Sequence, residues 1–268
     1  MDPSPGEFES FSQSLATRCL GRDFRYLAET DSTNTRAMVQ ARQGAPEGCL
    51  VLADSQSAGR GRLGRRWISP AGSSLLFSLV LRPPLPLSAA PQITLMLSVA
   101  LCRALRQSCG LPAEIKWPND VLVRGRKVCG ILVEMEGQPD RLDFLVAGVG
   151  LNVFQREADF PAELRDAASS LRREGGEDLS RPALLRAILE ETERAYDQLL
   201  QKGFQPILGE WQRLSAMTGR QVRVQTRGGQ MEGMALGLDP DGALQLRLDN
   251  GVIERLLAGD VTLLRPNS

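Results

Sequence analysis

The sequence predicts an α+β protein, in which a mixed sheet with helices forms a large domain and a small SH3-like β-barrel follows. Two observations lead to this prediction. Up to about residue 216, apolar strand-like runs alternate with helical stretches, which is typical of helices layered on a sheet. After residue 217 the runs are short and closely spaced between turns, which is typical of a small barrel. We therefore expect two domains, at residues 1–216 and 217–268.

Within the first domain, length and hydrophobic spacing distinguish strands from helices. Ser74–Leu81 is too apolar to face water on either side, so it predicts a central strand. Ala90–Ser108 has apolar residues at helical spacing and is followed by Gly110, which predicts a buried helix. Ser180 is typical of the N-cap of a helix that continues to about Leu200. We further expect a helix at 32–43, strands at 23–28, 49–54, 114–117, 121–123, 128–135 and 144–151, and an irregular lead-in at 1–21.

Short strands and turns fill the second domain. Its turns contain Gly, Asn and Asp, the residues that adopt tight-turn conformations most readily. The expected turns are 228–229, 239–242 and 249–251. The expected strands are 221–226, 233–238, 244–248 and 253–256.

Composition restricts the possible function classes. Of 268 residues, 42% are hydrophobic and 24% charged, as in ordinary globular proteins, and Lys+Arg and Asp+Glu both number 32. The zero net charge argues against a general nucleic-acid binder. No run of eighteen apolar residues occurs and the N-terminus is acidic and polar, so we expect neither a membrane span nor a secretory signal. The five cysteines form no CxxC pair, which predicts reduced, mostly buried thiols in the cytoplasm.

The chain contains no histidine. This absence excludes Ser-His and Cys-His nucleophilic catalysis and argues against a zinc site. Any chemistry must therefore depend on arginine, lysine, carboxylates, hydroxyls or a bound metal.

The strongest local motif is the stretch Gln56–Trp67, QSAGRGRLGRRW. Its glycines allow backbone N–H groups to approach a phosphate, and its four arginines donate to phosphate or carboxylate oxygens. From Ser55 to Ala113 there is no Asp or Glu, so nothing nearby in the sequence neutralises these arginines. The motif therefore favours an anionic ligand, although a solvated arginine loop is the plain alternative.

Gly59–Gly64 also fits the dinucleotide fingerprint GxGxxG. That fingerprint requires a helix directly after the glycines, so that the helix dipole meets the pyrophosphate. Pro70 and Gly72 argue against a helix here. We therefore reject the Rossmann interpretation.

Three further motifs combine polar residues with glycines. Lys116–Asp120 (KWPND) precedes Arg126–Glu134 (RKVCGILVE), and these two stretches hold two of the three lysines. The alternative for the first is a turn with its tryptophan in the core. Asp31–Asn34 is a cluster of small hydrogen-bonding side chains, which a helix N-cap would also explain. Gly148–Val153 (GVGLNV) is the third, and its glycines would also suit close strand packing.

Taken together and in this order, these motifs resemble the biotin–protein ligase family. The resemblance runs through 30–34, 56–70, 116–120, 126–134 and 148–152, and the C-terminal barrel is similar to that family's last domain. It implies a catalytic domain of the biotin/lipoate-ligase fold, which converts ATP and biotin to biotinyl-adenylate and then transfers biotin to a lysine of a biotin carboxyl carrier protein. Longer members carry a winged-helix DNA-binding domain of some sixty residues, and about thirty residues precede the matching segment here, so we expect the short form without DNA binding.

The resemblance also implies roles for individual residues. The polar cluster and Gln56 should hold the ureido ring of biotin, and the arginine–glycine stretch should close over the carboxylate and phosphate. The residues implied for biotin are Ser32, Thr33, Asn34, Gln56, Arg60, Gly61, Arg62, Lys127 and Gly130. The residues implied for ATP or the adenylate are Gly59, Arg62, Arg65, Trp67, Asn119, Asp120, Lys127 and Asn152. The implied catalytic residues are Lys127, Arg62 and Arg60, and Asp120 is the candidate for Mg²⁺.

Two other functions stay open at this point. A lipoate or octanoyl ligase or transferase shares the catalytic architecture, and a non-catalytic phosphate- or RNA-binding module would also use an arginine loop. The sequence does not identify the carrier protein, the oligomeric state, the adenine and metal contacts or the role of the barrel. An exposed strand edge of the catalytic domain would suit a homodimer, carrier docking or both.

Overall fold

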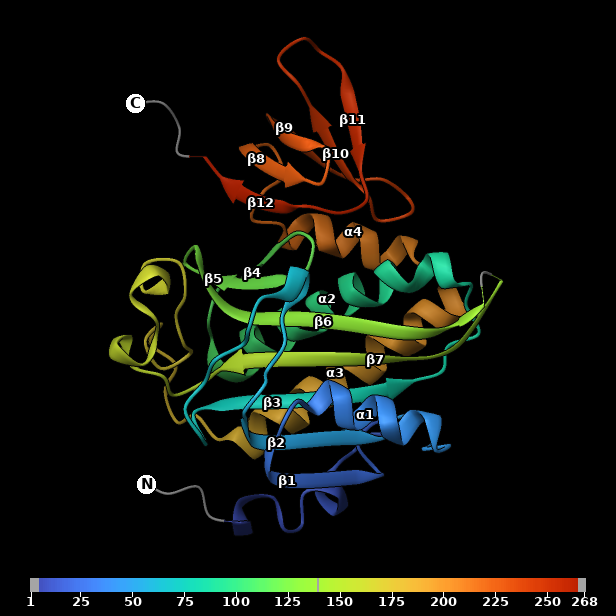
Figure 1. Cartoon of the computed structure of the whole chain (residues 1–268), viewed down its shortest axis with the longest axis vertical. Helices are drawn as coiled ribbons and strands as arrows, with labels where there is room; N and C mark the ends of the chain where they lie inside the picture. Colours follow the sequence, from blue (N-terminus) through green and yellow to red (C-terminus); the bar gives the residue numbers. More distant parts are fainter. Residues whose placement is uncertain (1–4, 139, 265–268) are drawn as a thin grey trace.

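A seven-stranded sheet forms the centre of the protein, in a computed structural model that describes residues 5–138 and 140–264 (Figure 1). Its strand order is β1-β2-β3-β7-β6-β5-β4, and β1 and β2 are parallel while the other neighbours are antiparallel. The mixed sheet predicted from the sequence is therefore confirmed. Its strands are β1 (Phe24–Thr30), β2 (Leu50–Gln56), β3 (Ser74–Leu81), β4 (Ala113–Lys116), β5 (Asp120–Val123), β6 (Arg126–Gln138) and β7 (Arg141–Asn152).

Helices cover both faces of this sheet (Figure 1). Alternate residues of a strand point to opposite faces, and β2 accordingly sends Val51 toward α1 (Thr33–Arg42) and Leu50 and Leu52 toward the larger core on the other face. That core contains α2 (Ala90–Cys109), α3 (Arg181–Lys202) and α4 (Gln205–Leu214). The face with the small helix α1 is the more open one.

The helix α2 is the most apolar of the chain. Its stretch Leu87–Cys109 is long and apolar enough to cross a membrane, but 67% of the relevant window is buried inside the protein. α2 packs against α3, α4 and β6. Burial against these elements identifies α2 as a core helix.

The lead-in 1–21 is less irregular than expected. Its residues 1–4 lie outside the described part, but Phe8, Phe11, Leu15 and Leu20 are buried in the main core. Phe8 and Phe11 pack edge to face, 5.6 Å between ring centroids. The sequence did not predict that residues 5–21 pack onto the core, because short apolar segments of this kind show no periodicity.

The C-terminal region is a five-stranded antiparallel sheet, ordered β11-β10-β9-β8-β12 (Figure 1). The sequence prediction missed β12, and β9 begins four residues earlier than expected. Its closure as an SH3-like barrel and the exact boundary near residue 216 stay predictions. The strands are β8 (Gln221–Thr226), β9 (Gly229–Leu238), β10 (Leu244–Arg247), β11 (Ile253–Leu256) and β12 (Asp260–Leu263).

Candidate active site

The arginine-rich motif forms a narrow loop between β2 and β3, which we call the arginine loop (Ser57–Trp67). Backbone hydrogen bonds join its two arms, from Gly61 N–H to Arg65 O at 2.7 Å and from Trp67 N–H to Gly59 O at 3.0 Å. A Cβ on Gly59 would lie 2.5 Å from the Trp67 carbonyl oxygen, so only glycine fits there. No helix follows the loop, which agrees with rejecting the Rossmann interpretation.

The arginines of the loop have partners that sequence proximity did not reveal. Arg60 forms an ion pair with Glu134 of β6, and Arg65 forms one with Asp260 of β12. Both carboxylates come from elements far along the chain, so the absence of nearby acids in the sequence did not reveal them. Arg62 differs, since its Nη1 donates to Asn119 Oδ1 at 3.0 Å and no carboxylate of the described residues lies within ion-pair distance.

Arg62 is the most deeply placed cation of the loop. Burial lowers the pKa of its guanidinium, while Asp260 and Asp120 act in the opposite direction at longer range. An arginine side chain stays charged in proteins even so. Arg62 is thus a partly dehydrated positive charge that an entering anion would stabilise.

The Asp31–Asn34 motif lies at the start of α1, but it does more than cap the helix. Ser32 occupies the N-cap position and makes no side-chain hydrogen bond to the helix backbone. Gln56 Oε1 instead accepts from the Thr33 N–H at 2.7 Å and from its hydroxyl at 3.1 Å. Ser78 of β3 donates to Asn34 Oδ1 at 2.6 Å. Hydrogen bonds thus link Thr33, Gln56, Asn34 and Ser78 into one network, and the buried Ser32 lies beside it; we call these five residues the polar cluster.

Glycines provide the floor beside the polar cluster. A Cβ on Gly148 would overlap the Asn34 side chain, and a Cβ on Gly150 would lie 2.6 Å from the Trp67 ring. A Cβ on Gly130 would lie 3.0 Å from the same ring. The glycines of β6 and β7 therefore face the site and allow its side chains to lie directly on the sheet, rather than serving strand packing alone.

Two lysines share one carboxylate next to this floor. Lys127 Nζ lies 2.6 Å from Asp120 Oδ1, and Lys116 Nζ lies 3.5 Å from Asp120 Oδ2. Lys127 Nζ also lies 5.7 Å from the ring centroid of Trp67, within the range of a cation–π contact. Trp117 is buried in the core, as the plain alternative for its motif predicted.

These groups line one cavity of about 390 Å³. Every site residue predicted from the sequence lines it except Gly59. Asn152 is among them, but its Nδ2 donates to Ser169 O at 2.9 Å and its Oδ1 accepts from Gln155 at 2.9 Å, so both its polar atoms already have partners. The cavity joins hydrogen-bonding groups at one end to lysines and arginines at the other.

Comparisons with known proteins agree with this arrangement. The profile of the Biotin/lipoate A/B protein ligase family matches residues 26–152, and that of the Biotin protein ligase C terminal domain matches residues 218–264. A bifunctional ligase/repressor BirA from Bacillus subtilis is 39% identical over 249 residues, which cover 93% of this chain and 76% of that protein. The chain belongs to the biotin protein ligase family.

Other members of the family are similar over nearly their whole length. A biotin–[acetyl-CoA-carboxylase] ligase from Paracoccus denitrificans is 37% identical, covering 82% of this chain and 92% of that protein. The solved biotin protein ligase from Aquifex aeolicus, in complex with biotin and ATP, superimposes with a TM-score of 0.78 at 31% identity, over 93% of this chain and 100% of that one. The fold predicted from the family resemblance is thus confirmed.

Sequence reasoning missed several residues of this ligase site. Ser78 was included in an apolar strand, and its only signal was a hydroxyl inside an otherwise hydrophobic run. Glu134 and Asp260 pair with the arginine loop from far along the chain. Phe160–Ala168 contributes further lining residues, and Lys127 N–H donates to Ala167 O at 2.8 Å, but this segment has no periodic pattern that would reveal it. The additional lining residues of this segment are Phe160, Pro161, Leu164, Ala167 and Ala168.

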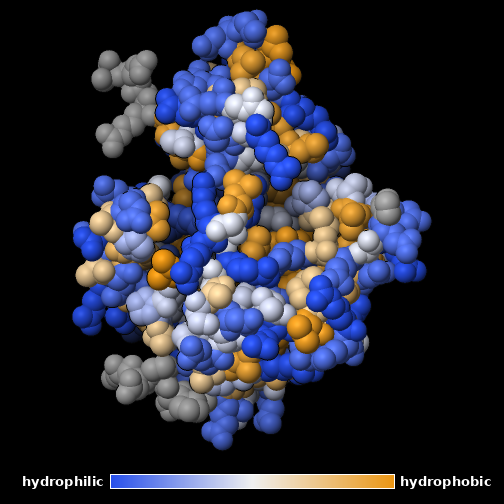
Figure 2. Space-filling model, viewed as in Figure 1, coloured by the Kyte–Doolittle hydropathy of each residue, from blue (hydrophilic) through white to orange (hydrophobic). Residues whose placement is uncertain are grey.

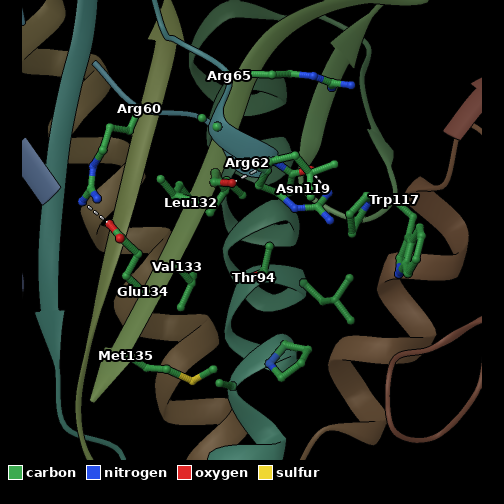
Figure 3. A pocket seen from close by; sticks show the side chains of 18 of the residues that line it. Arg60, Arg62, Arg65, Thr94, Trp117, Asn119, Leu132, Val133, Glu134 and Met135 are labelled. Carbon is green, nitrogen blue, oxygen red and sulfur yellow. Dashed lines mark hydrogen bonds and ion pairs between the residues drawn. The ribbon is translucent and has the colours of Figure 1, made fainter. Parts of the chain in front are cut away.

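A second cavity of about 770 Å³ lies on the other side of the arginine loop (Figure 3). It is bounded by the loop, the first turns of α2, β6 and the C-terminal residues Gly242 and Leu257. In Figure 3, Thr94 of α2, Asn119 and Met135 border the same hollow, and Arg60 reaches across β6 to Glu134. The surface view shows this hollow below the C-terminal sheet, with hydrophilic and hydrophobic residues side by side (Figure 2). The arginine loop therefore forms a wall between two cavities.

Proposed function

We propose that this ligase activates biotin with ATP, forms biotinyl-adenylate and transfers the biotinyl group to a lysine of an acceptor protein. The observation that carries the proposal is the single cavity that joins the polar cluster to the lysines and arginines. The relatives support it, since one is named for acetyl-CoA carboxylase and another was solved with biotin and ATP. The acceptor is accordingly a biotin carboxyl carrier protein.

The polar cluster suits the ureido ring of biotin. That ring has one carbonyl and two N–H groups, so a matching pocket needs both donors and acceptors. Ser32, Thr33, Asn34 and Gln56 line the cavity and provide them, and the fully buried Ser78 supports Thr33 and Asn34 by hydrogen bonds. We propose that these side chains exchange part of their mutual hydrogen bonds for bonds to the ring.

The cationic end suits the reaction itself. A carboxylate oxygen of biotin forms a bond to the α-phosphorus of ATP, and the bond from that phosphorus to the bridging oxygen breaks, releasing pyrophosphate. The cavity is lined by six cationic side chains and two carboxylates, which offset the repulsion between these anions. In the second step the acceptor amine attacks the acyl carbon, a proton is lost and AMP leaves. No enzyme nucleophile is required, in agreement with a chain without histidine.

We propose individual roles on this basis. Lys127 contacts the biotin carboxylate and the α-phosphate, and Arg60 and Arg62 close over them from the loop. Gly61 and Gly130 allow the backbone to approach the ligand closely, whereas Gly59, which does not line the cavity, lets the two arms of the loop pack together. The residues proposed for the nucleotide are Arg65, Trp67, Asn119, Asp120 and Asn152.

Magnesium would reach this site together with the nucleotide. The described residues contain no group of three His, Cys, Asp or Glu side chains that could hold a metal ion. Mg²⁺ commonly binds one or two carboxylates plus substrate phosphates, and the single carboxylate of Asp120 fits that pattern. Bound there, the ion would neutralise phosphate charge. Asp120 would then exchange a lysine partner for the ion.

The acceptor has a candidate docking edge on β6. The pairing of β5 with β6 ends at Gly130, and the Ile131 N–H donates to Asn119 O at 3.0 Å on the same side. Along a strand, the backbone N–H and C=O groups of successive residues point to opposite edges. The N–H and C=O groups of Val133 and Met135 therefore point to the same edge as those of Ile131, away from β7 and toward the second cavity. We propose that an extended segment of the acceptor pairs with this edge by strand addition. A homodimer, the other use of a strand edge left open by the sequence, stays a prediction.

The proposed function predicts two separable reactions. With biotin and ATP, the purified protein should release pyrophosphate and hold biotinyl-adenylate, and a biotin carboxyl carrier domain should then become biotinylated. Met135→Pro removes an edge N–H without removing a bond of the β6–β7 ladder, so transfer should fall while adenylate formation continues. Pyrophosphate release and mass spectrometry of the acceptor measure the two steps.

Met135→Leu is the matched control, since it changes the same side chain and keeps the N–H. It should transfer at the rate of the unchanged protein. Absence of biotin-dependent pyrophosphate release from the unchanged protein would refute the ligase proposal. Equal transfer by the Pro and Leu variants would refute only the docking edge.

Arg62→Gly should release the intermediate. Arg62 connects the loop to Asn119 and to Gly259 O, at 3.0 and 3.5 Å, so its loss loosens the wall that shields a hydrolysable acyl-adenylate. Lysines of unrelated proteins should then become biotinylated. The measurement is biotin incorporation into serum albumin with ATP present, and Arg227→Gly, at an exposed position just after β8, is the control. Incorporation no greater than in the control would contradict the proposed role.

The remaining predictions concern organisation and location. We propose residues 1–216 as the catalytic domain and 217–268 as the C-terminal domain, with Asp260 of the latter completing the ligand cavity. All five cysteines are free, and Cys49, Cys102 and Cys129 are buried. Free thiols and the use of ATP support a cytoplasmic location.

A further inference from the structure

Lys116 is the lysine of the cavity to which the roles proposed above assign no contact with the ligand. It is the last residue of β4 and lines the ligand cavity with its side chain one quarter exposed. The ammonium group of Lys116 contacts Asp120 Oδ2, whereas that of Lys127 contacts Asp120 Oδ1. A cross-strand ion pair that only joins β4 to β5 is the plain alternative.

The strand order gives the site a direction. Going across the sheet from the polar cluster to Lys116, the strands follow in the order β3, β7, β6, β5 and β4. Ser78 and Gly148 mark the ureido end on β3 and β7, and Lys127 follows on β6. Neighbouring strands are about 4.8 Å apart, so Lys116 lies about two strand spacings beyond Lys127. A ligand extended along this line meets the ureido groups first, then Lys127 and then Lys116.

The chemistry of the first step uses this direction. In displacement at phosphorus, the attacking and leaving oxygens lie roughly in line on opposite sides of the phosphorus. If the biotin carboxylate approaches from the side of the polar cluster, pyrophosphate must leave on the far side, over β5 and β4. Lys116 is the lysine on that side.

We infer that Lys116 binds the β- and γ-phosphates of ATP and stabilises the pyrophosphate leaving group. As the bond to the bridging oxygen breaks, its electron pair goes to pyrophosphate, whose charge increases. An ammonium on the strand floor offsets that charge, while Lys127 acts at the carboxylate and α-phosphate. This inference rests on the proposed ligase function.

The test compares Lys116→Met with Lys202→Met, since Lys202 is the remaining lysine and is exposed at the end of α3. Biotin-dependent ATP–pyrophosphate exchange gives the pyrophosphate concentration at half-maximal rate. Lys116→Met should raise it by about 10-fold or more, and Lys202→Met should leave it unchanged. Lys116→Arg should recover part of the loss, because it keeps the charge.

Two further measurements separate this role from a structural one. Calorimetric biotin binding and transfer from separately supplied biotinyl-adenylate involve no β- or γ-phosphate, so Lys116→Met should leave both unchanged. An unaltered half-maximal pyrophosphate concentration, or an equal fall in biotin binding and adenylate transfer, would overturn the inference alone. No biotin-dependent exchange by the unchanged protein would overturn the ligase proposal and this inference with it.

Discussion

Lys127→Ala is expected to slow the formation of biotinyl-adenylate by on the order of 10²–10³, while biotin binding changes little. The ammonium group of Lys127 lies beside Asp120 and Trp67, and in the proposed role its charge would meet the carboxylate and α-phosphate as the bond between them forms. The benefit of that charge is largest in the transition state, because the two anions are then closest. Single-turnover adenylate formation, followed by pyrophosphate release, measures the effect.

Lys202→Ala is the control, because it removes an exposed lysine outside the site. Lys127→Arg should recover little of the rate, since a planar guanidinium places its charge differently from a compact ammonium. Adenylate formation at the unchanged rate in Lys127→Ala would make Lys127 a structural residue of β6. Equal losses in biotin affinity and rate would assign it to ground-state binding instead.

The unchanged protein should bind biotin about 10⁴-fold more tightly than lipoate. The dithiolane ring of lipoate lacks the ureido carbonyl and N–H groups, so the polar cluster would lose bonds to water without gaining bonds to the ligand. Discrimination of this size is typical of sites built around hydrogen bonds that a competitor cannot make. Calorimetric titration with each acid gives the two dissociation constants.

Ser32→Ala provides a matched test of the cause. The Ser32 side chain makes no helix-capping hydrogen bond, so its loss should leave α1 intact. The variant should lose biotin affinity and keep its weak lipoate affinity. Equal binding of the two acids by the unchanged protein would exclude the biotin assignment and favour a lipoate or octanoyl enzyme.

The central elements could be predicted because their signals are local. Apolar runs identified β2 and β3, and helical spacing with a glycine end identified α2. α4 was missed although Ile207, Trp211 and Leu214 follow a helical period, since its ten residues are short and begin next to a proline. β12 was missed although its four residues alternate between polar and apolar, because so short a run is a weak signal for a strand.

The ligand cavity was predicted well where motifs carry it and poorly where tertiary contacts do. Thr33, Gln56 and Lys127 belong to recognisable stretches. Glu134 and Asp260 become part of the site only because the folded chain places them against the arginine loop. The sequence shows no acid close to these arginines, and the two carboxylates that pair with them come from strands far along the chain.

Glu134 connects the two ends of the cavity, since its Oε2 accepts from Asn34 Nδ2 at 2.8 Å and also pairs with Arg60. A ligand that binds Asn34 would weaken its hydrogen bond to Glu134 and so alter the ion pair of Glu134 with Arg60. An anion that draws Arg60 away from Glu134 would in turn alter the hydrogen bond that Glu134 accepts from Asn34. If biotin and the nucleotide bind as proposed, their binding is energetically linked through this one carboxylate oxygen. If bound biotin changes the affinity for the nucleotide by some factor, bound nucleotide must change the affinity for biotin by the same factor.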